Sequence, residues 1–72
     1  MPADEHHVVC HLDSLLESRG MTLIELSRRV EVTVANLSVL KNNRAKAIRF
    51  STLGAICRVL DCSVGELLSH ER

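Results

Sequence analysis

The 72-residue sequence predicts an all-α fold, a single small domain of five short helices. Apolar residues make up 46% of the chain, which is enough for a packed core. Trp and Tyr are absent and Phe50 is the only Phe, so the core must be built from Leu, Ile, Val and Ala. This composition favours helices over the strands of a sandwich or barrel. Apolar residues at helical spacing, separated by cap residues, predict the same fold class.

The first helix is expected over about 12–19, because Leu12, Leu15 and Leu16 follow the i, i+3, i+4 spacing of one helix face. Gly20 then suits the left-handed conformation that ends many helices. A second helix is expected over about 23–30. Its start is predicted by a capping box, in which the side chains of Thr22 and Glu25 each bond a free N–H group of the other residue.

A third helix is expected over about 34–42, with Thr33 as its cap and Leu37 and Leu40 on its buried face. Only two residues, 31 and 32, separate it from the second helix. Two helices joined so tightly cannot lie antiparallel, so they must cross steeply, as in a helix-turn-helix.

The C-terminal half continues with a polar loop over 41–49 and a fourth helix over about 51–60, for which Ser51 is the expected cap. One last helical turn is predicted by three apolar residues: Val64, Leu67 and Leu68.

At the other end of the chain, the β-branched residues Val8 and Val9 predict a short extended segment over 6–10. The expected domain boundaries are 8–69 for the helical domain and 1–7 for a flexible N-terminus.

The formal net charge is zero, yet the charges are segregated along the chain. Residues 1–27 carry a net charge of −4, residues 28–49 carry +5 and residues 50–72 carry −1. A basic middle segment between acidic ends is typical of a protein that binds a polyanion, and an ordinary solvated loop is the alternative.

Other classes of protein are disfavoured. No apolar run is long enough to cross a bilayer, and no apolar segment follows a basic N-terminus as in a secretory signal. Three cysteines are an odd number, unlike a disulfide framework, so we expect a reducing, cytoplasmic location. We expect no enzymatic activity and no cofactor, because the sequence holds no set of nucleophile, base and orienting residue and no glycine-rich phosphate loop.

Two further groups of residues have the spacing or chemistry of a possible site. His7, Cys10 and His11 have the spacing of metal ligands on a helix, but the extended segment and the missing fourth ligand predict no metal. Cys57 and Cys62 fall at or beside core positions, where cysteine behaves as a small apolar residue; a redox role is the alternative.

One long stretch, Met21 to Leu68, resembles the helix-turn-helix of phage repressors and Cro, the xenobiotic-response-element family of bacterial regulators: MTLIELSRRVEVTVANLSVLKNNRAKAIRFSTLGAICRVLDCSVGELL. Its ending, from Arg49 onward, resembles the compact members that consist of the DNA-binding domain alone. The resemblance implies a five-helix lambda-repressor-like fold and a bacterial or phage-encoded transcriptional regulator that binds double-stranded DNA. We expect repression by occlusion of the promoter.

In such a motif the second helix, here about 34–42, enters the major groove. Because Leu37 and Leu40 point inward, five residues are expected to face the bases: Val34, Ala35, Ser38, Val39 and Asn42. Valine cannot hydrogen-bond a base edge but packs against thymine methyl groups, so we expect modest, T-rich readout. The alternative is that the valines bury against another protein, as in an antitoxin or adaptor of the same fold.

Phosphate contacts are expected from residues in and after this helix and at helix starts: Thr22, Thr33, Asn36, Lys41, Arg44, Lys46 and Arg49. The resemblance also implies a homodimer, with its recognition helices about 34 Å apart. Two candidate interfaces stay open, the last helix through Val64, Leu67 and Leu68 and the segment from His6 to Cys10. Equally, the last helix closes the monomer core, or the extended segment pairs with the C-terminal residues.

Two residues depart from the family pattern at turns. Glu31 stands where the family usually has Gly, and a left-handed backbone there would cost a non-Gly residue about 1 kcal/mol. Asn43 replaces another common Gly, but Asn tolerates that conformation.

Overall fold

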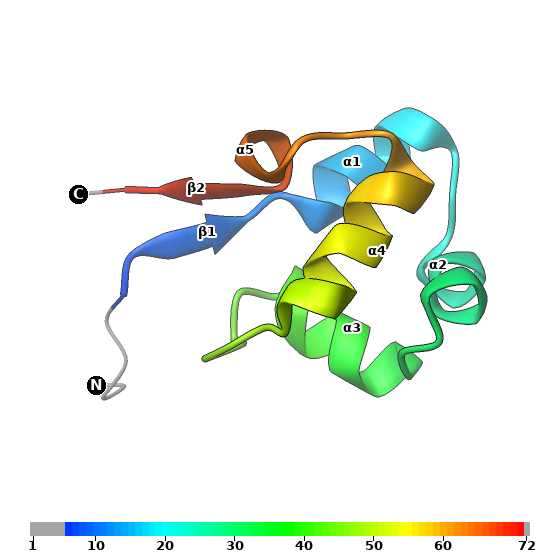
Figure 1. Cartoon of the computed structure of the whole chain (residues 1–72), viewed down its shortest axis with the longest axis horizontal. Helices are drawn as coiled ribbons and strands as arrows, with labels where there is room; N and C mark the ends of the chain where they lie inside the picture. Colours follow the sequence, from blue (N-terminus) through cyan, green and yellow to red (C-terminus); the bar gives the residue numbers. More distant parts are fainter. Residues whose placement is uncertain (1–5, 72) are drawn as a thin grey trace.

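The computed structural model describes residues 6–71. Within this range five helices and two short strands follow one another: β1 (Val8–Cys10), α1 (Leu12–Arg19), α2 (Leu23–Val30), α3 (Val34–Lys41), α4 (Phe50–Leu60), α5 (Val64–Leu67) and β2 (Leu68–His70). Figure 1 shows α4 crossing the middle of the molecule, with α1, α2 and α3 around it and the two strands extending to one side. The predicted helical fold class is confirmed. Residues 1–5 of the N-terminus that we expected to be flexible lie outside the described residues.

The core is formed by leucines from every helix, together with Ile56 of α4 and Cys10 of β1. Six side chains have almost no contact with solvent: Leu12, Leu26, Leu37, Ile56, Leu60 and Leu67. Burying one such side chain contributes about 1.5–3 kcal/mol relative to leaving it exposed. No polar or charged residue is buried in the described part of the chain, so packing of apolar side chains holds the helices together.

The extended segment expected over 6–10 is confirmed over Val8–Cys10, which pairs with the C-terminal residues, whereas His7 has a left-handed backbone at φ 60°. β1 and β2 form an antiparallel pair in which Val8 lies opposite His70 and Cys10 lies opposite Leu68. The predicted last helical turn is therefore one residue too long, because Leu68 already belongs to the strand. Leu67 is wholly buried and closes the core of the monomer.

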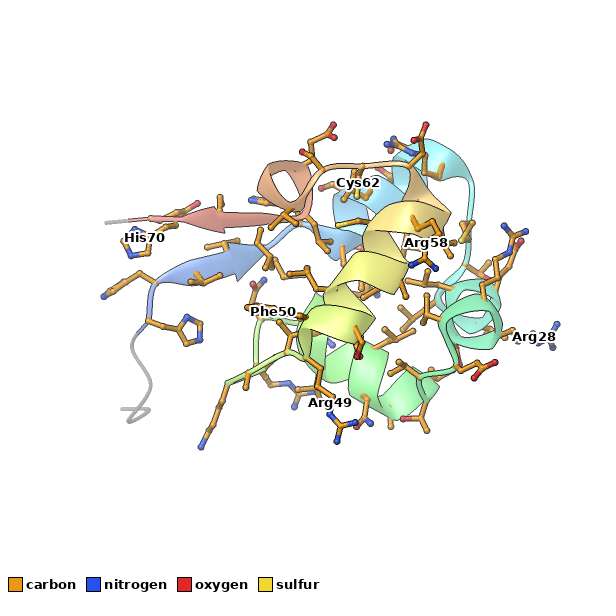
Figure 2. All side chains as sticks on the ribbon, viewed as in Figure 1. Arg28, Arg49, Phe50, Arg58, Cys62 and His70 are labelled. Carbon is orange, nitrogen blue, oxygen red and sulfur yellow. The ribbon has the colours of Figure 1, made fainter. Side chains whose placement is uncertain are left out.

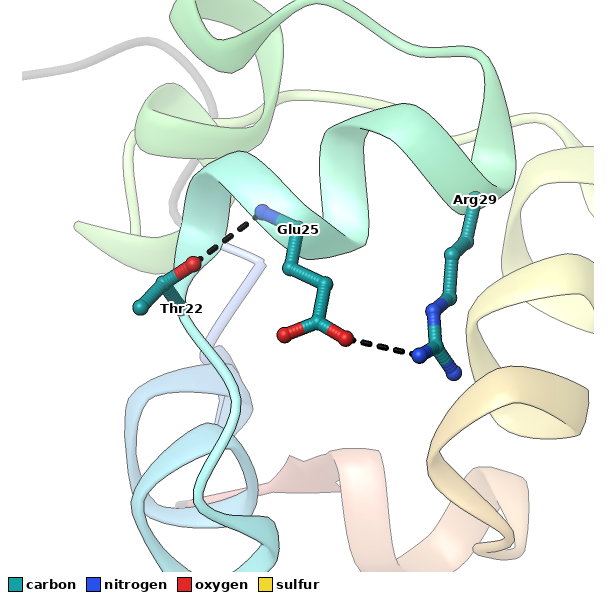
Figure 3. A network of polar contacts seen from close by, with 3 residues as sticks. All are labelled: Thr22, Glu25 and Arg29. Carbon is teal, nitrogen blue, oxygen red and sulfur yellow. Dashed lines mark hydrogen bonds and ion pairs between the residues drawn. The ribbon is translucent and has the colours of Figure 1, made fainter.

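The ends of α1 and α2 follow local backbone chemistry. Gly20 adopts the expected left-handed conformation at φ 63°, and the N–H groups that follow α1 bond the carbonyl oxygens of its last turn. The Thr22 hydroxyl accepts a hydrogen bond from the backbone N–H of Glu25 at 3.1 Å. The predicted return bond from Glu25 is wrong, because its carboxylate instead pairs with Arg29 at 2.7 Å on the next turn (Figure 3).

The reciprocal cap occurs instead at α5. The Ser63 hydroxyl accepts from the backbone N–H of Glu66 at 3.2 Å, and the Glu66 carboxylate accepts from the Ser63 N–H at 2.8 Å. The prediction that Ser51 caps α4 is also wrong. Arg49, with extended backbone at φ −73° and ψ 142°, is the residue before the helix, and no side chain caps it.

Arg19 joins the ends of two helices that lie far apart in the sequence. Its Nε donates to the Leu60 carbonyl oxygen at 2.7 Å, and a terminal nitrogen donates to the Asp61 carbonyl oxygen at 3.1 Å. The last carbonyl groups of a helix lack partners within it and carry partial negative charge. A cation from α1 therefore stabilises the C-terminal end of α4.

Candidate nucleic-acid interface

The turn between α2 and α3 sets the angle at which α3 leaves the bundle. Glu31 adopts the left-handed conformation at φ 57° and ψ 39°, as expected for a position where the family usually has Gly. The Ser27 hydroxyl donates to the Val32 carbonyl oxygen at 2.7 Å, which closes the turn from the side of α2. A residue without a hydroxyl at this position would lose the bond.

Helix α3 has one buried face and one exposed face. Leu37 and Leu40 are buried against the rest of the bundle. On the other side, Val34 is 40% exposed and Val39 is 37% exposed, and Ala35 is also exposed. The residues expected to face the bases are thus brought together on one accessible surface, with Ser38 half-buried at its edge and Asn42 exposed at its end.

The two polar residues expected to read bases are bonded to each other. The side-chain amide of Asn42 donates to the backbone oxygen of Ser38 at 2.9 Å and to its hydroxyl at 3.2 Å. These bonds leave the carbonyl oxygen of the Asn42 side chain free to accept a further hydrogen bond. The apolar side chains Val34, Ala35 and Val39 therefore dominate the exposed surface.

An open groove of about 840 Å³ runs between α3, the loop that follows it and the start of α4. Five of the seven residues expected to contact phosphates line this groove: Thr33, Asn36, Arg44, Lys46 and Arg49. The Thr33 hydroxyl accepts from the N–H of Asn36 at 3.1 Å, so its own hydrogen remains available to a ligand. Three cationic side chains and several hydrogen-bond donors thus line one groove beside the exposed face of α3.

The other two residues of this set lie elsewhere. Lys41 points toward α1, where its Nζ lies 3.7 Å from a carboxylate oxygen of Asp13. Exposed pairs of this kind contribute about 0–1 kcal/mol, so the lysine can exchange this partner for another anion. Thr22 caps α2, and it does not line the groove.

Residues that the sequence analysis did not assign to the interface also line the groove. Ser51 and Thr52, at the start of α4, both line it. Glu31 contributes a negative charge to the same groove, at the end nearest the turn.

The basic loop is anchored to the N-terminal strand through its left-handed residue. Asn43 has φ 61°, and its side-chain oxygen accepts from the backbone N–H of Cys10 at 2.7 Å. Farther along, a ring nitrogen of His6 lies 3.3 Å from the Ala45 carbonyl oxygen. These contacts position the cationic loop against the bundle. Figure 2 shows Arg49 projecting from the end of this loop beside α3.

Comparisons with known proteins agree with this geometry. Residues 11–72 match the model of the Cro/C1-type HTH DNA-binding domain. The chain belongs to the Cro/C1-type helix-turn-helix family. Over 63 residues it is 51% identical to YozG of Bacillus subtilis (strain 168), which is named an uncharacterized HTH-type transcriptional regulator. The aligned region covers 88% of this chain and 75% of that protein.

Membership of this family confirms that the chain is a DNA-binding domain of the kind found in transcriptional regulators. α2 and α3 are the two helices of its motif, and α3 is the second of them. Among the residues that the structure describes, no helix is both long and apolar enough to span a membrane. The described residues also hold no cluster of three or more potential metal-ligating side chains.

Proposed function

We propose that this chain is a transcriptional repressor that binds a specific operator by inserting α3 into the major groove. One observation carries the proposal: the exposed face of α3 stands directly beside a groove lined by three cationic side chains. In a helix-turn-helix the second helix reads base edges while its surroundings contact the backbone. A domain seated on a promoter prevents polymerase from occupying the same DNA.

The base contacts are proposed to be mainly apolar. Val34, Ala35 and Val39 offer methyl groups to the C5-methyl groups of thymine, the one apolar feature of the major groove. The free carbonyl oxygen of Asn42 accepts from an exocyclic amino group of adenine or cytosine. A site rich in thymine, with few fully specified positions, is the expected operator.

The phosphate contacts are proposed to come from Arg44, Lys46 and Arg49 in the groove, with Lys41 leaving Asp13 for the DNA backbone. The Thr33 and Thr22 hydroxyls and the Asn36 amide add neutral contacts. About four cations per subunit make about eight phosphate contacts in a dimer, so the logarithm of affinity should fall with the logarithm of salt concentration at a slope of about −7.

We further propose that the protein is cytoplasmic, is encoded by a bacterium or phage, and binds its operator as a homodimer. A single recognition helix reads only a few base pairs, and two half-sites one helical turn apart require two subunits. Leu67 cannot contact the second subunit, because its side chain is buried within the monomer.

Selection of bound DNA from random oligonucleotides, followed by mobility-shift titration, tests the proposal. Arg44→Ala is expected to weaken binding to all sequences alike and to make the salt slope less negative by about 1 per subunit. Val39→Ala is expected to cost about 1 kcal/mol on thymine-containing sites and little where that thymine is replaced.

Val64→Ala is the matched control, because Val64 is an exposed valine on α5, away from the groove. It should leave binding to a single half-site unchanged. Absent or salt-insensitive binding by a chain that retains its helicity would contradict the proposal. That result would favour a protein-binding antitoxin or adaptor, for which the exposed valines of α3 would form the contact surface.

A further inference from the structure

Helix α4 exposes a large aromatic side chain for which the monomer offers no cover. Phe50 is 89% exposed, more than any other large hydrophobic residue in the described part of the chain. It is the first residue of α4 (Figure 2). Aromatic rings dominate the energetics of cores and interfaces because each buries a large area. Phe50 is therefore the largest apolar side chain that α4 offers to a partner.

One turn farther along, Gly54 occupies a position in the middle of α4 that the monomer does not explain. A side chain added there would meet nothing within 4 Å, and Gly54 is not among the residues with positive φ. Glycine inside a helix lowers its stability relative to alanine. The absence of a side chain at Gly54 leaves a flat site on α4 at which a second backbone can approach closely.

Arg58 extends the same row by one more turn. Phe50, Gly54 and Arg58 are all exposed and have the i, i+4, i+8 spacing of one helix ridge. Arg58 takes part in neither of the ion pairs found among the described residues. Figure 2 shows Arg58 toward the opposite end of α4 from Phe50. The three residues are hereafter called the α4 ridge.

We propose that the α4 ridge is the surface through which two copies of this chain pair. A two-fold axis passing beside Gly54 makes the two helices antiparallel and sets glycine against glycine at the crossing point. It then places Phe50 over the partner's Arg58, and the same contact occurs a second time in reverse. A guanidinium within about 6 Å of an aromatic face is attracted to the ring.

A second copy fits this surface because the ridge is complementary to itself. An interface across a two-fold axis uses the same patch on both subunits, so one patch must carry both halves of every contact. The ridge meets this requirement, with a ring at one end, a cation at the other and a flat centre between them. Two ridges of i±4 residues interdigitate at a crossing angle of about 50°.

The size of the surface predicts a weak dimer. Two buried phenylalanine rings contribute about 300–500 Å², whereas a stable interface usually buries about 1,200–2,000 Å² in total. Pairing is therefore expected to be dynamic in free solution and strengthened when DNA holds both subunits. This inference deepens the proposed function, since it names the surface by which a second copy fills the second half-site.

Sedimentation equilibrium of the whole chain without DNA, from micromolar to millimolar concentration, tests the ridge directly. The weight-average mass of the wild type is expected to rise from 8.0 kDa toward twice that value. Gly54→Gln adds an uncharged, helix-favouring side chain that fits the monomer but separates the two helices. Gly54→Gln and Phe50→Gln should each weaken association at least about tenfold.

Ile24→Gln is the matched control, because Ile24 is a large apolar residue, 56% exposed, that lies on α2 outside the ridge. It should leave association unchanged. On selected DNA, Gly54→Gln is expected to keep its affinity for a single half-site and to lose cooperative filling of two.

The inference would be overturned if the wild type stayed monomeric and filled two half-sites independently. It would also be overturned if the ridge variants associated as strongly as the wild type. A third contrary result would be a Phe50→Gln variant that binds a single half-site more weakly but associates normally. The last result would assign the ring to DNA contact. If the protein binds no DNA at all, the proposed function fails, but sedimentation in free solution still decides the role of the ridge.

Discussion

Glu31 holds a left-handed backbone without the freedom of glycine, so replacing it should stabilise the protein. This conformation costs a non-glycine residue about 1–2 kcal/mol. Glycine escapes that cost but loses about 0.4–1 kcal/mol through the greater entropy of its unfolded chain. Glu31→Gly should therefore raise the free energy of unfolding by about 0.5–1 kcal/mol, which raises Tm by about 3–6 °C in a domain of this size.

Two further variants separate backbone strain from charge and from side-chain contacts. Glu31→Gln removes the same negative charge but keeps the strain, so its Tm should stay near that of the wild type. Asn43→Gly replaces a second left-handed residue, but it deletes the oxygen that accepts from the Cys10 N–H at 2.7 Å. An unsatisfied part-buried N–H costs about 1–3 kcal/mol, so Asn43→Gly should lower stability.

Thermal and urea unfolding followed by circular dichroism would measure all three variants. Glycine is expected to change stability in opposite directions at these two positions, although their φ angles, 57° and 61°, are nearly equal. Equal effects of Glu31→Gly and Glu31→Gln would show that charge, not backbone strain, sets the change. Stabilisation by Asn43→Gly would show that the Cys10 contact contributes less than the relief of backbone strain.

Three other predictions concern helix ends and thiols. Arg19→Met should lower the free energy of unfolding, measured by urea titration, by about 1–2 kcal/mol, because two carbonyl groups at the end of α4 lose a charged donor. Arg28→Met, at an exposed residue of α2, should change the free energy of unfolding little in the same titration. Hydrogen bonds from the Ser63 N–H, and then from its hydroxyl, hold the pKa of the Glu66 carboxyl group below its ordinary value of 4.5. The ionised carboxylate therefore stabilises the fold above pH 4.5, and this stabilisation disappears as the pH falls through the lowered pKa. The difference in stability between wild type and Glu66→Gln should accordingly shrink as the pH falls below 4.5, and a constant difference would contradict the cap. Burial, reinforced by the neighbouring Cys57 thiol, raises the pKa of Cys62 from 9.0 to about 11. Iodoacetamide at pH 8 should therefore alkylate Cys62 about 100-fold more slowly in the native protein than in urea, because less of the thiol is ionised. Equal alkylation rates in the two states would refute the burial of this thiol.

Much of the fold could be predicted because its signals are local. The apolar spacing of Leu12, Leu15 and Leu16 identified α1, and Gly20 marked its end. The steep crossing of α2 and α3 was expected because only two residues separate the two helices. Each of these features depends on contacts within about one helical turn, so neighbouring residues alone determine them.

Competition between partners was not predictable. Glu25 had the spacing to bond the Thr22 N–H, yet in the folded chain its carboxylate pairs with Arg29. Both interactions satisfy local rules and differ by a few tenths of a kcal/mol, so the sequence cannot choose between them. The same applies to Ser51, because the loop before it places Arg49 at the start of the helix.

The sequence by itself determined which residues form helices, which side chains fill the core and which face of α3 is left exposed, since periodicity and cap chemistry act over a few residues. Only the tertiary structure decided that β1 pairs with β2, that Arg19 reaches the end of α4 and that the cations after α3 share one groove with Thr33. These contacts join segments as many as about 60 residues apart. Their geometry follows from how the whole set of helices packs around one core, and no local pattern encodes that arrangement.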